Sequence, residues 1–344
     1  MDGKFAFDGG RSLVTGASGF VGSRLVARLA AAGVPVTVLL ADWEPDSELI
    51  RSGVIDRVEV CRGRLEDFAL IERTVRLGGF ETVYHLAAVA QQDAAFADPL
   101  RAFEANIRGT YHVLEACRRA AGSVKRVLVA SSDKAYGGDA RLPYDESMAM
   151  NGLNPYDVSK SCADLLARAY HASYGVPVAV GRYGNTFGPG DRNFSRLIPG
   201  TVRRLLSGQS PVIKRPAGQD FSRDFLYIED SVESYFAMAA GIDRGVAGGE
   251  AYNFAMGVSY SPTRIVEQLQ RLMGAEHLVP QVIEPPHEEI LHQQVSNTKA
   301  REQLGWTPRW TLEEGLAATV AWYTDLLAGP VRSASGQPER HAAR

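Results

Sequence analysis

The chain has 344 residues, of which 45% are hydrophobic and 22% charged, and its formal net charge is −3. This is the composition of an ordinary globular protein with enough apolar material for a core. The weakly acidic balance disfavours nucleic acid and anionic membranes as partners. The cysteines Cys61, Cys117 and Cys162 are odd in number and widely spaced, which argues against a disulfide framework and favours a reducing compartment.

Targeting signals are not evident in the sequence. No apolar run approaches the roughly 18 residues that a membrane-spanning helix needs. The first ten residues lack the basic start and apolar stretch of a signal peptide. We therefore expect a cytoplasmic protein with no membrane partner.

The chain up to Val180 alternates short apolar runs with longer segments of helical periodicity. The runs predict strands over Ser12–Thr15, Val36–Leu40, Val58–Cys61, Thr82–Leu86, Arg126–Ala130 and Val176–Val180. The periodic segments predict helices over Val21–Ala32, Leu70–Arg76, Pro99–Ala121 and Asp157–Tyr174. Strands that alternate with helices indicate βαβ units, and nearly continuous apolar strands fit a parallel sheet covered on both faces. The sequence therefore predicts an α/β protein with a Rossmann-type, doubly wound parallel sheet.

The composition of the chain changes after Gly181, where Gly, Pro and Arg become more frequent. Residues 182–224 contain eight basic side chains and three acids, a local charge of +5. This segment is either an anion site, for example for phosphate, or a solvated basic face. Residues 329–344 hold too little apolar surface to order themselves, and we expect a flexible tail there.

A glycine loop follows the first predicted strand, in the stretch Leu13-Val-Thr-Gly-Ala-Ser-Gly-Phe-Val-Gly. Gly16 permits a tight turn, Gly19 lets backbone N–H groups approach a pyrophosphate, and Gly22 lets the helix pack closely on the strand. The positive end of the helix dipole favours the same anion. A strand, this loop and a helix in that order predict a dinucleotide site.

The choice between NAD and NADP depends on the end of the second strand. An acid about 20 residues after the loop binds the adenosine ribose of NAD. The usual acid position falls on Leu40, and Asp42 lies two residues beyond it. No arginine stands there to receive a 2′-phosphate, so the sequence favours NAD, with Asp42 as the ribose contact, and leaves NADP open.

Tyr156 and Lys160 lie one helical turn apart, on one face of a predicted helix. The pKa of an isolated tyrosine is about 10, and a cation within a few ångströms lowers it by roughly 1–3 units. Tyr156 could then act as a general base. Ser132 follows the predicted strand Arg126–Ala130 at the carboxyl edge of the sheet, where it could hydrogen-bond the same substrate oxygen as Tyr156.

Taken together, these motifs resemble the extended short-chain dehydrogenase/reductases, and among them the NAD-dependent nucleotide-sugar epimerases and dehydratases. The matching segments span roughly residues 11 to 325: the glycine loop, Tyr84-His-Leu-Ala-Ala88, Asn106-Ile-Arg-Gly-Thr110, the Ser132 segment, Tyr156 with Lys160, Gly184-Asn185, Arg223-Asp-Phe225 and Leu304-Gly-Trp306. The active-site pattern is most similar to that of CDP-glucose 4,6-dehydratase-like enzymes.

The resemblance implies a seven-stranded Rossmann domain, a smaller mixed α/β substrate domain, tightly bound NAD and a nucleoside-diphosphate sugar in the cleft. The NAD domain would comprise residues 1–181 and about 225–260, and the nucleotide-sugar domain residues 182–224 and 261–328. The expected cofactor contacts are Gly16, Ser18, Gly19, Phe20, Val21, Gly22, Asp42, Leu65, Leu86, Ala87, Ala88, Tyr156 and Lys160. The expected substrate contacts are Asn185, Arg192, Arg196 and Arg223.

The resemblance also implies catalytic roles. Tyr156 would remove the proton of the sugar 4-hydroxyl, Lys160 would lower the pKa of Tyr156 and hold the nicotinamide ribose, and Ser132 would hold the 4-oxygen. In the 4,6-dehydratases an acid and a base follow the serine, and here that pair is Asp133 and Lys134. Asp133 would protonate the leaving 6-hydroxyl, and Lys134 would be either the base at C5 or a charge that stabilises the C4 enolate.

The predicted function is therefore an NAD-dependent nucleoside-diphosphate-sugar 4,6-dehydratase. A 4-epimerase and a uronic-acid decarboxylase are alternatives within the same family, and a non-catalytic dinucleotide-binding regulator is an alternative of another class. A metal site at His287 and His292 is disfavoured because the two are five residues apart rather than four and follow prolines, so we expect no metal. The helices at Pro99–Ala121 and Asp157–Tyr174 are apolar on more than one face, and the family implies a homodimer through a four-helix bundle.

Overall fold

The structure, a computed structural model, describes residues 10–138, 141–216, 218–219, 221–285 and 290–328. The segment 329–344, for which the sequence predicts a flexible tail, and His287 of the disfavoured metal motif lie outside these residues. In the described ranges, no helix combines the length and the apolarity that crossing a membrane requires.

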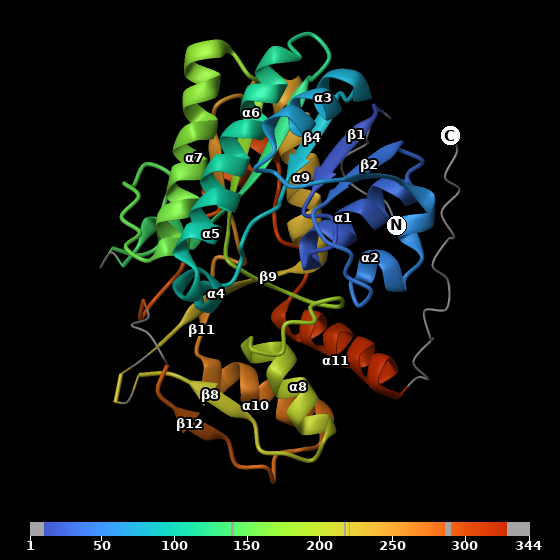
Figure 1. Ribbon diagram of the computed structural model, residues 1–344. Coiled ribbons are helices and arrows are strands. Elements are labelled where there is room, and N and C mark those ends of the chain that lie inside the picture. The colour runs from blue at the N-terminus through green and yellow to red at the C-terminus, as the bar shows by residue number, and fades with distance from the viewer. Residues whose placement is uncertain (1–9, 139–140, 217, 220, 286–289, 329–344) are drawn as a thin grey trace.

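A seven-stranded parallel sheet forms the upper part of the molecule (Figure 1), in the order β10-β6-β5-β4-β1-β2-β3. Its strands are β1 (Ser12–Thr15), β2 (Val36–Leu40), β3 (Glu59–Arg62), β4 (Thr82–His85), β5 (Arg126–Ser132), β6 (Val178–Tyr183) and β10 (Ala251–Phe254). Every pairing in it is parallel. From β1 the strand order runs to β2 and β3 on one side and continues with β4 on the other side. Doubly wound sheets bind dinucleotides at the point where the strand order reverses, here between β1 and β4.

Helices cover both faces of this sheet. They are α1 (Phe20–Ala31), α2 (Glu48–Arg51), α3 (Phe68–Gly78), α4 (Gln92–Ala97), α5 (Pro99–Phe103), α6 (Gly109–Arg119), α7 (Pro155–Tyr174) and α9 (Ile228–Asp243). One buried apolar cluster joins α1 and α9 to the sheet, and a second joins α3, α6 and α7 to its other face. Burial on both faces explains the nearly continuous apolar strands, and the prediction of a doubly wound α/β sheet is confirmed.

A smaller mixed α/β region lies below the sheet (Figure 1). It holds α8 (Leu197–Leu206), α10 (Pro262–Met273), α11 (Leu312–Ala328) and five short strands. The strands are β7 (Asn185–Phe187), β8 (Val212–Lys214), β9 (Arg223–Tyr227), β11 (Ser259–Tyr260) and β12 (Gln281–Ile283), arranged as β11-β9-β7 and β12-β8. A third apolar cluster joins α8, α10 and α11 to β7 and β9. The boundaries of the two expected domains stay a prediction.

Two local expectations need correction. The sequence predicts six strands for the large sheet from its own patterning, and β10 was missed because Ala251–Phe254 is a short segment that returns to the sheet after a long excursion. The helix predicted over Pro99–Ala121 is interrupted by a π-helical turn at Glu104–Arg108. Asn106 lies in that turn. Its Oδ1 accepts a hydrogen bond from the backbone N–H of Val89 at 2.7 Å, and its Nδ2 donates one to the Ser159 hydroxyl at 2.9 Å.

Candidate active site

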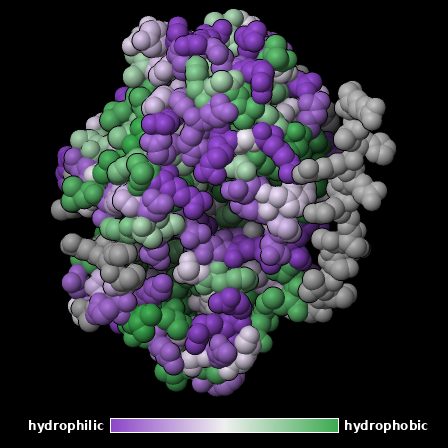
Figure 2. Space-filling model, in the orientation of Figure 1, coloured by the Kyte–Doolittle hydropathy of each residue, from purple (hydrophilic) through white to green (hydrophobic). Residues whose placement is uncertain are grey.

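A cavity of about 880 Å³ lies between the carboxyl edge of the large sheet and the smaller region. Figure 2 shows the molecule hollowed near the centre of the face in view, with hydrophilic residues at the rim. The thirteen expected cofactor contacts and the five expected catalytic residues all line the cavity, as do Asn185, Arg196 and Arg223. Arg192 is the exception, because it is not among the lining residues. Its Nη2 lies 3.7 Å from Oδ1 of Asp46.

The glycine loop closes tightly against the strand beside it. Gly16 has φ +75°, and a Cβ there would lie 2.6 Å from the backbone nitrogen of Ala87. A Cβ on Gly22 would lie 2.0 Å from the carbonyl oxygen of Gly16. Helix α1 begins after Gly19 with no side-chain cap and no acid in its first turn. The residues therefore fit a dinucleotide, since backbone and helix dipole can meet a pyrophosphate at close range.

The far end of the cofactor side is formed by the residues that follow β2. Leu40, the last residue of that strand, is buried, whereas Asp42 is exposed, and both line the cavity. An exposed carboxylate at this end of the sheet fits the hydroxyls of an adenosine ribose. Its assignment as the ribose contact stays a prediction.

Tyr156 and Lys160 lie in the first turns of α7, which begins at Pro155. Proline is favoured at this first helical position because its missing N–H has no partner there in any case. Lys160 is only 6% exposed, and its Nζ donates to the carbonyl oxygen of Ala130 at 3.0 Å. Burial lowers the pKa of Lys160 to about 8. A lysine with a pKa this close to neutral can take up or release a proton during a reaction in the cavity.

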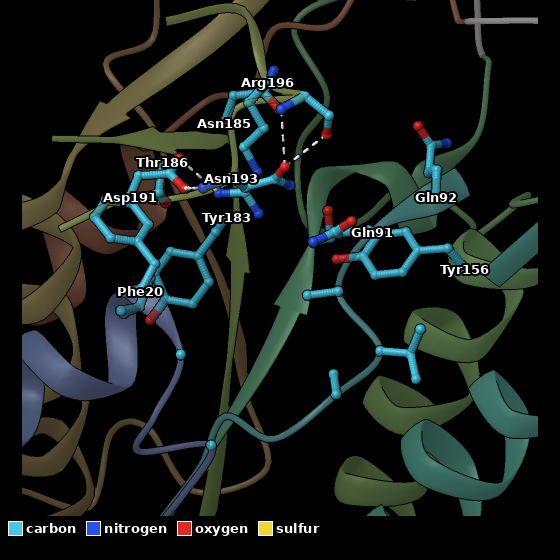
Figure 3. Close-up of a pocket in the computed structure, with 18 of the residues that line it drawn as sticks. Phe20, Gln91, Gln92, Tyr156, Tyr183, Asn185, Thr186, Asp191, Asn193 and Arg196 are labelled. Carbon is cyan, nitrogen blue, oxygen red and sulfur yellow. Dashed lines mark hydrogen bonds and ion pairs between the residues drawn. The ribbon is translucent and has the colours of Figure 1, made fainter. Parts of the chain in front are cut away.

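Burial raises the pKa of Tyr156 to about 12. A hydrogen bond with Ser132 and the charge of Arg196 act in the opposite direction. The leading cationic contribution therefore comes from Arg196, in the smaller region, rather than from Lys160 as the helical spacing predicts. Figure 3 shows Tyr156 on one side of the cavity, with Asn185 and Arg196 on the other.

Ser132 and Asp133 lie where β5 ends and a short 3₁₀ turn, Asp133–Tyr136, begins. The Ser132 hydroxyl donates to Oδ1 of Asp133 and accepts from the backbone N–H of Lys134, both at 3.2 Å. Asp133 is 3% exposed, and its Oδ2 has no hydrogen-bond partner among the described residues. The serine thereby links the proposed base on α7 to a carboxyl that lines the same cavity.

The pKa of Asp133 is raised because the carboxyl is buried. The charges of Lys134 and Arg223 and the hydrogen bond from Ser132 counteract this rise without cancelling it. A raised pKa makes this carboxyl better suited to carry a proton and give it to a leaving group. The sequence alone left this balance open, because it does not show how deeply Asp133 is buried.

His85 lies at the end of β4, behind the cavity. Its Nδ1 lies 2.8 Å from Oγ1 of Thr15 and its Nε2 lies 3.0 Å from Oγ1 of Thr110. Burial and the charge of Lys160 lower the pKa of His85 to about 3. The ring is therefore a neutral bridge between β1, β4 and α6.

The smaller region supplies a basic wall. The Arg223 guanidinium is 6% exposed, stacks over the ring of Phe221 at 3.8 Å, and donates to the carbonyl oxygens of Ser222 and Leu291 at 2.9 and 3.1 Å. Arg196 Nη1 donates to Oδ2 of Asp191 at 3.1 Å. Lining residues that were not among the predicted contacts include Gln91, Thr201, Arg203, Arg204, Lys214 and Phe221. All of these except Gln91 lie in residues 182–224, and the +5 charge of that segment was the available signal.

In the part of the chain that the structure describes, no three His, Cys, Asp or Glu side chains cluster as metal ligands would. His292 instead places its Nδ1 3.0 Å from the hydroxyl of Ser222. The geometry is thus that of a dinucleotide-dependent enzyme with a Ser–Tyr–Lys constellation facing a basic substrate wall.

Comparison with known proteins places this geometry in a family. Residues 12–255 match the NAD dependent epimerase/dehydratase family, and the chain belongs to that family. The chain is 32% identical over 319 residues to dTDP-glucose 4,6-dehydratase from Streptomyces griseus, covering 90% of this chain and 93% of that protein. It is 30% identical over 341 residues to CDP-glucose 4,6-dehydratase from Salmonella typhimurium, covering 94% of this chain and 93% of the relative.

Solved structures agree with this assignment. The dTDP-glucose 4,6-dehydratase of Streptomyces venezuelae, determined with NAD bound, superimposes with a TM-score of 0.82 at 28% identity, covering 92% of this chain and 97% of that one. The UDP-glucose 4-epimerase of Thermotoga maritima, determined with UDP-glucose, gives a TM-score of 0.83 at 26% identity, covering 92% and 99%. The family and its NAD dependence, both expected from the sequence, are confirmed.

Proposed function

We propose that the protein is an NAD-dependent nucleoside-diphosphate-sugar 4,6-dehydratase. The observation that carries this proposal is Asp133, a buried carboxyl with a raised pKa that lines the cavity beside Ser132 and whose Oδ2 has no partner among the described residues. A 4-epimerase needs no acid to expel a hydroxyl group from C6, whereas a dehydratase does. The dehydratases named above support the same choice.

The first half of the reaction oxidises the sugar at C4. Tyr156 accepts the proton of the 4-hydroxyl while Ser132 donates a hydrogen bond to the 4-oxygen. NAD, when bound, would supply the redox chemistry of the site, as acceptor of the hydride from C4 and as donor of a hydride to C6. Lys160 and the glycine loop are proposed to hold the cofactor.

The second half removes water from the 4-keto sugar. The C5–H bond breaks as its proton passes to a base, a C5=C6 double bond forms, and the C6–O bond breaks as Asp133 gives its proton to the departing oxygen. Reduction at C6 and protonation at C5 complete the product. Lys134 is proposed either to take the C5 proton or to stabilise the enolate formed at C4.

The nucleoside diphosphate is proposed to lie along the basic wall. Asn185, Arg196 and Arg223 line the cavity there, and guanidinium groups match the geometry of phosphate oxygens. Arg192 stays a proposed contact although it does not line the cavity. This placement accounts for the +5 charge that the sequence concentrates in residues 182–224.

We further propose a homodimer formed through a four-helix bundle. Leu165 on α7 is 55% exposed and lies opposite the face of that helix that is buried against the sheet. A second copy of α7 and of the α5–α6 segment would cover this apolar face. Sedimentation of the wild type as a dimer and of Leu165→Glu as a monomer would support the bundle, and a wild-type monomer would refute it.

The experiment that tests the function is mass spectrometry on a panel of nucleoside-diphosphate hexoses incubated with the holoenzyme. We expect one substrate to lose one water and thereby to identify the nucleotide. Asp133→Asn should abolish water loss while C4 oxidation continues, whereas Asp145→Asn, the same change outside the cavity, should leave water loss intact. A new chromatographic peak without a change in mass would overturn the proposal in favour of an epimerase, and loss of carbon dioxide would indicate a uronic-acid substrate.

A further inference from the structure

Tyr136 ends the 3₁₀ turn that carries Asp133 and Lys134, but it does not line the cavity. Its side chain is 1% exposed and lies behind the turn, in a small cluster with Tyr144 and Val295. Its hydroxyl accepts a hydrogen bond from Arg182 Nη1 at 2.7 Å and donates one to Asn253 Oδ1 at 2.8 Å. The turn is therefore attached to strands β6 and β10 through one phenol.

Arg182 is itself fixed by a buried ion pair. Its Nε donates to Oδ2 of Asp164 at 2.7 Å and its Nη2 donates to Oδ1 at 3.1 Å. The arginine and the aspartate are 1% and 0% exposed. A bidentate pair of this kind fixes direction as well as distance, because the guanidinium is a rigid planar fork.

Asp164 belongs to α7, the helix that carries Tyr156 and Lys160. A second link joins the same helix to the same turn at Ser161. Its hydroxyl lies 3.1 Å from the carbonyl oxygen of Ala135 and 3.0 Å from that of Asp157 in its own helix, so the two acceptors share one proton. The turn with the proposed acid and the helix with the proposed base are thus connected at two points, both behind the cavity and both buried.

We propose that Tyr136, held by the Arg182–Asp164 ion pair, is a positioning residue that sets Asp133 at the distance from Tyr156 that one hexose requires. The inference rests on the proposed function. In a 4,6-dehydratase the two groups act on O4 and O6 of the same hexose, whose C5–C6 bond must be held in one rotamer for elimination. A shift of the turn would therefore move Asp133 away from O6 while Tyr156 stays at O4. A misplacement of about 1 Å can cost about 10²-fold in rate.

The decisive variant is Tyr136→Phe, which removes the hydroxyl and leaves Arg182 Nη1 and Asn253 Oδ1 without this partner. We expect water loss to slow by about 10²-fold while hydrogen transfer from C4 keeps its rate. Reduced nicotinamide should then accumulate in a single turnover and be visible by its absorbance, whereas the wild type should consume it. A role in stability alone would slow both steps equally.

Tyr252→Phe is the matched control. Tyr252 is also fully buried and precedes Asn253 on β10. Its hydroxyl lies 3.1 Å from the carbonyl oxygen of Val246 and 2.9 Å from Oε1 of Gln303, away from the turn, and one proton serves both acceptors. Tyr252→Phe removes a hydroxyl from the same kind of buried environment, so the ratio of the rates of C4 oxidation and water loss should stay at its wild-type value. Circular dichroism and thermal unfolding of both variants would verify the fold.

A milder variant, Ser161→Ala, tests the second link and keeps the inference open to refutation if Tyr136→Phe does not fold. Loss of one hydrogen bond predicts a reduction in water loss of about 2- to 10-fold, again with C4 oxidation retained. Equal losses in both half-reactions, or no loss in either, would overturn the positioning role. If the wild type removes no water from any sugar in the panel, the proposed function is refuted. That outcome is distinct from a change in the ratio of the two half-reaction rates in the variants, which tests the positioning role alone.

Discussion

The two walls of the cavity are built by different means. On the proposed cofactor wall the closest approach is made by backbone: Gly16 and Gly22 leave no room for a Cβ, and α1 begins there without a capping side chain. On the proposed substrate wall the lining groups include cationic side chains such as Arg196, Arg223 and Lys214. Tyr156 belongs to the first wall by its helix and to the second by its electrostatic partner, Arg196.

This difference shows what each wall can tolerate. A backbone cradle has fixed dimensions, so a single added methyl group disturbs it. A set of long charged side chains is adjustable, and each member contributes a modest part of the attraction, which salt weakens. The following predictions would break or sharpen this contrast.

Tyr156→Phe should have the largest effect, because the residue serves both walls. Loss of a general base typically costs 10²–10⁴-fold in rate, and we expect a reduction of about that size in C4 oxidation. Stopped-flow absorbance of reduced nicotinamide would measure it. A variant that retains full activity would favour the non-catalytic regulator instead.

Lys160→Met should change stability with a distinct dependence on pH. Burial lowers the pKa of Lys160 from its ordinary 10.5 to about 8, so folding is penalised below pH 8 and the penalty fades as pH rises towards 10.5. The difference corresponds to about 3 kcal/mol. In urea unfolding, the free energy of unfolding of the wild type should rise relative to that of the variant above pH 8. A difference between the two free energies that does not depend on pH would contradict the lowered pKa of Lys160. Catalytic activity should be lost.

Gly22→Ala tests the cofactor wall alone. The new Cβ would lie 2.0 Å from the Gly16 carbonyl oxygen, so the loop must shift. Overpacking of this kind costs about 1–3 kcal/mol, and NAD affinity measured by calorimetry should fall while nucleoside-diphosphate affinity is retained. Gly138→Ala is the control, because a Cβ there meets no atom within 4 Å. Equal losses for both ligands would show that the walls are not independent.

Lys214→Ala tests the substrate wall and should have the smallest effect. Lys214 is exposed and lines the cavity, and an exposed charge contributes about 0.2–1 kcal/mol. Affinity for a nucleoside diphosphate should fall slightly, less so at high salt, and NAD affinity should not change. Calorimetric titrations at two ionic strengths would measure this. A loss that is independent of salt would contradict a purely electrostatic role.

The sequence predicted those parts of the fold that depend on local pattern. The large sheet and its helices follow from alternating apolar runs, and the glycine loop and the Tyr156–Lys160 pair are short motifs with fixed spacing. The strand β10 and the π-helical turn around Asn106 were missed, because both depend on partners distant in the chain: β6 for the strand, and Val89 and Ser159 for the turn.

The same limit applies to the site. The sequence placed Asp133 in the site but did not show that burial outweighs the opposing charges of Lys134 and Arg223 on its pKa. Nor did it show that Arg196, contributed by another part of the chain, acts on Tyr156. These are sums over residues that meet only after folding, and no spacing rule encodes them.

The chain order of the large sheet constrains how such a protein can be divided. Strand β10 pairs with β6, yet β7, β8 and β9 of the smaller region lie between them in the sequence. A fragment that ends after β6 would lack β10 and α9, and with α9 much of the cover on one face of the sheet. The cofactor half therefore cannot be obtained by simple truncation. In a chimera of two relatives, the segment between β6 and β10 would have to be exchanged as one insert, and both of its ends would have to fit the strands of the large sheet.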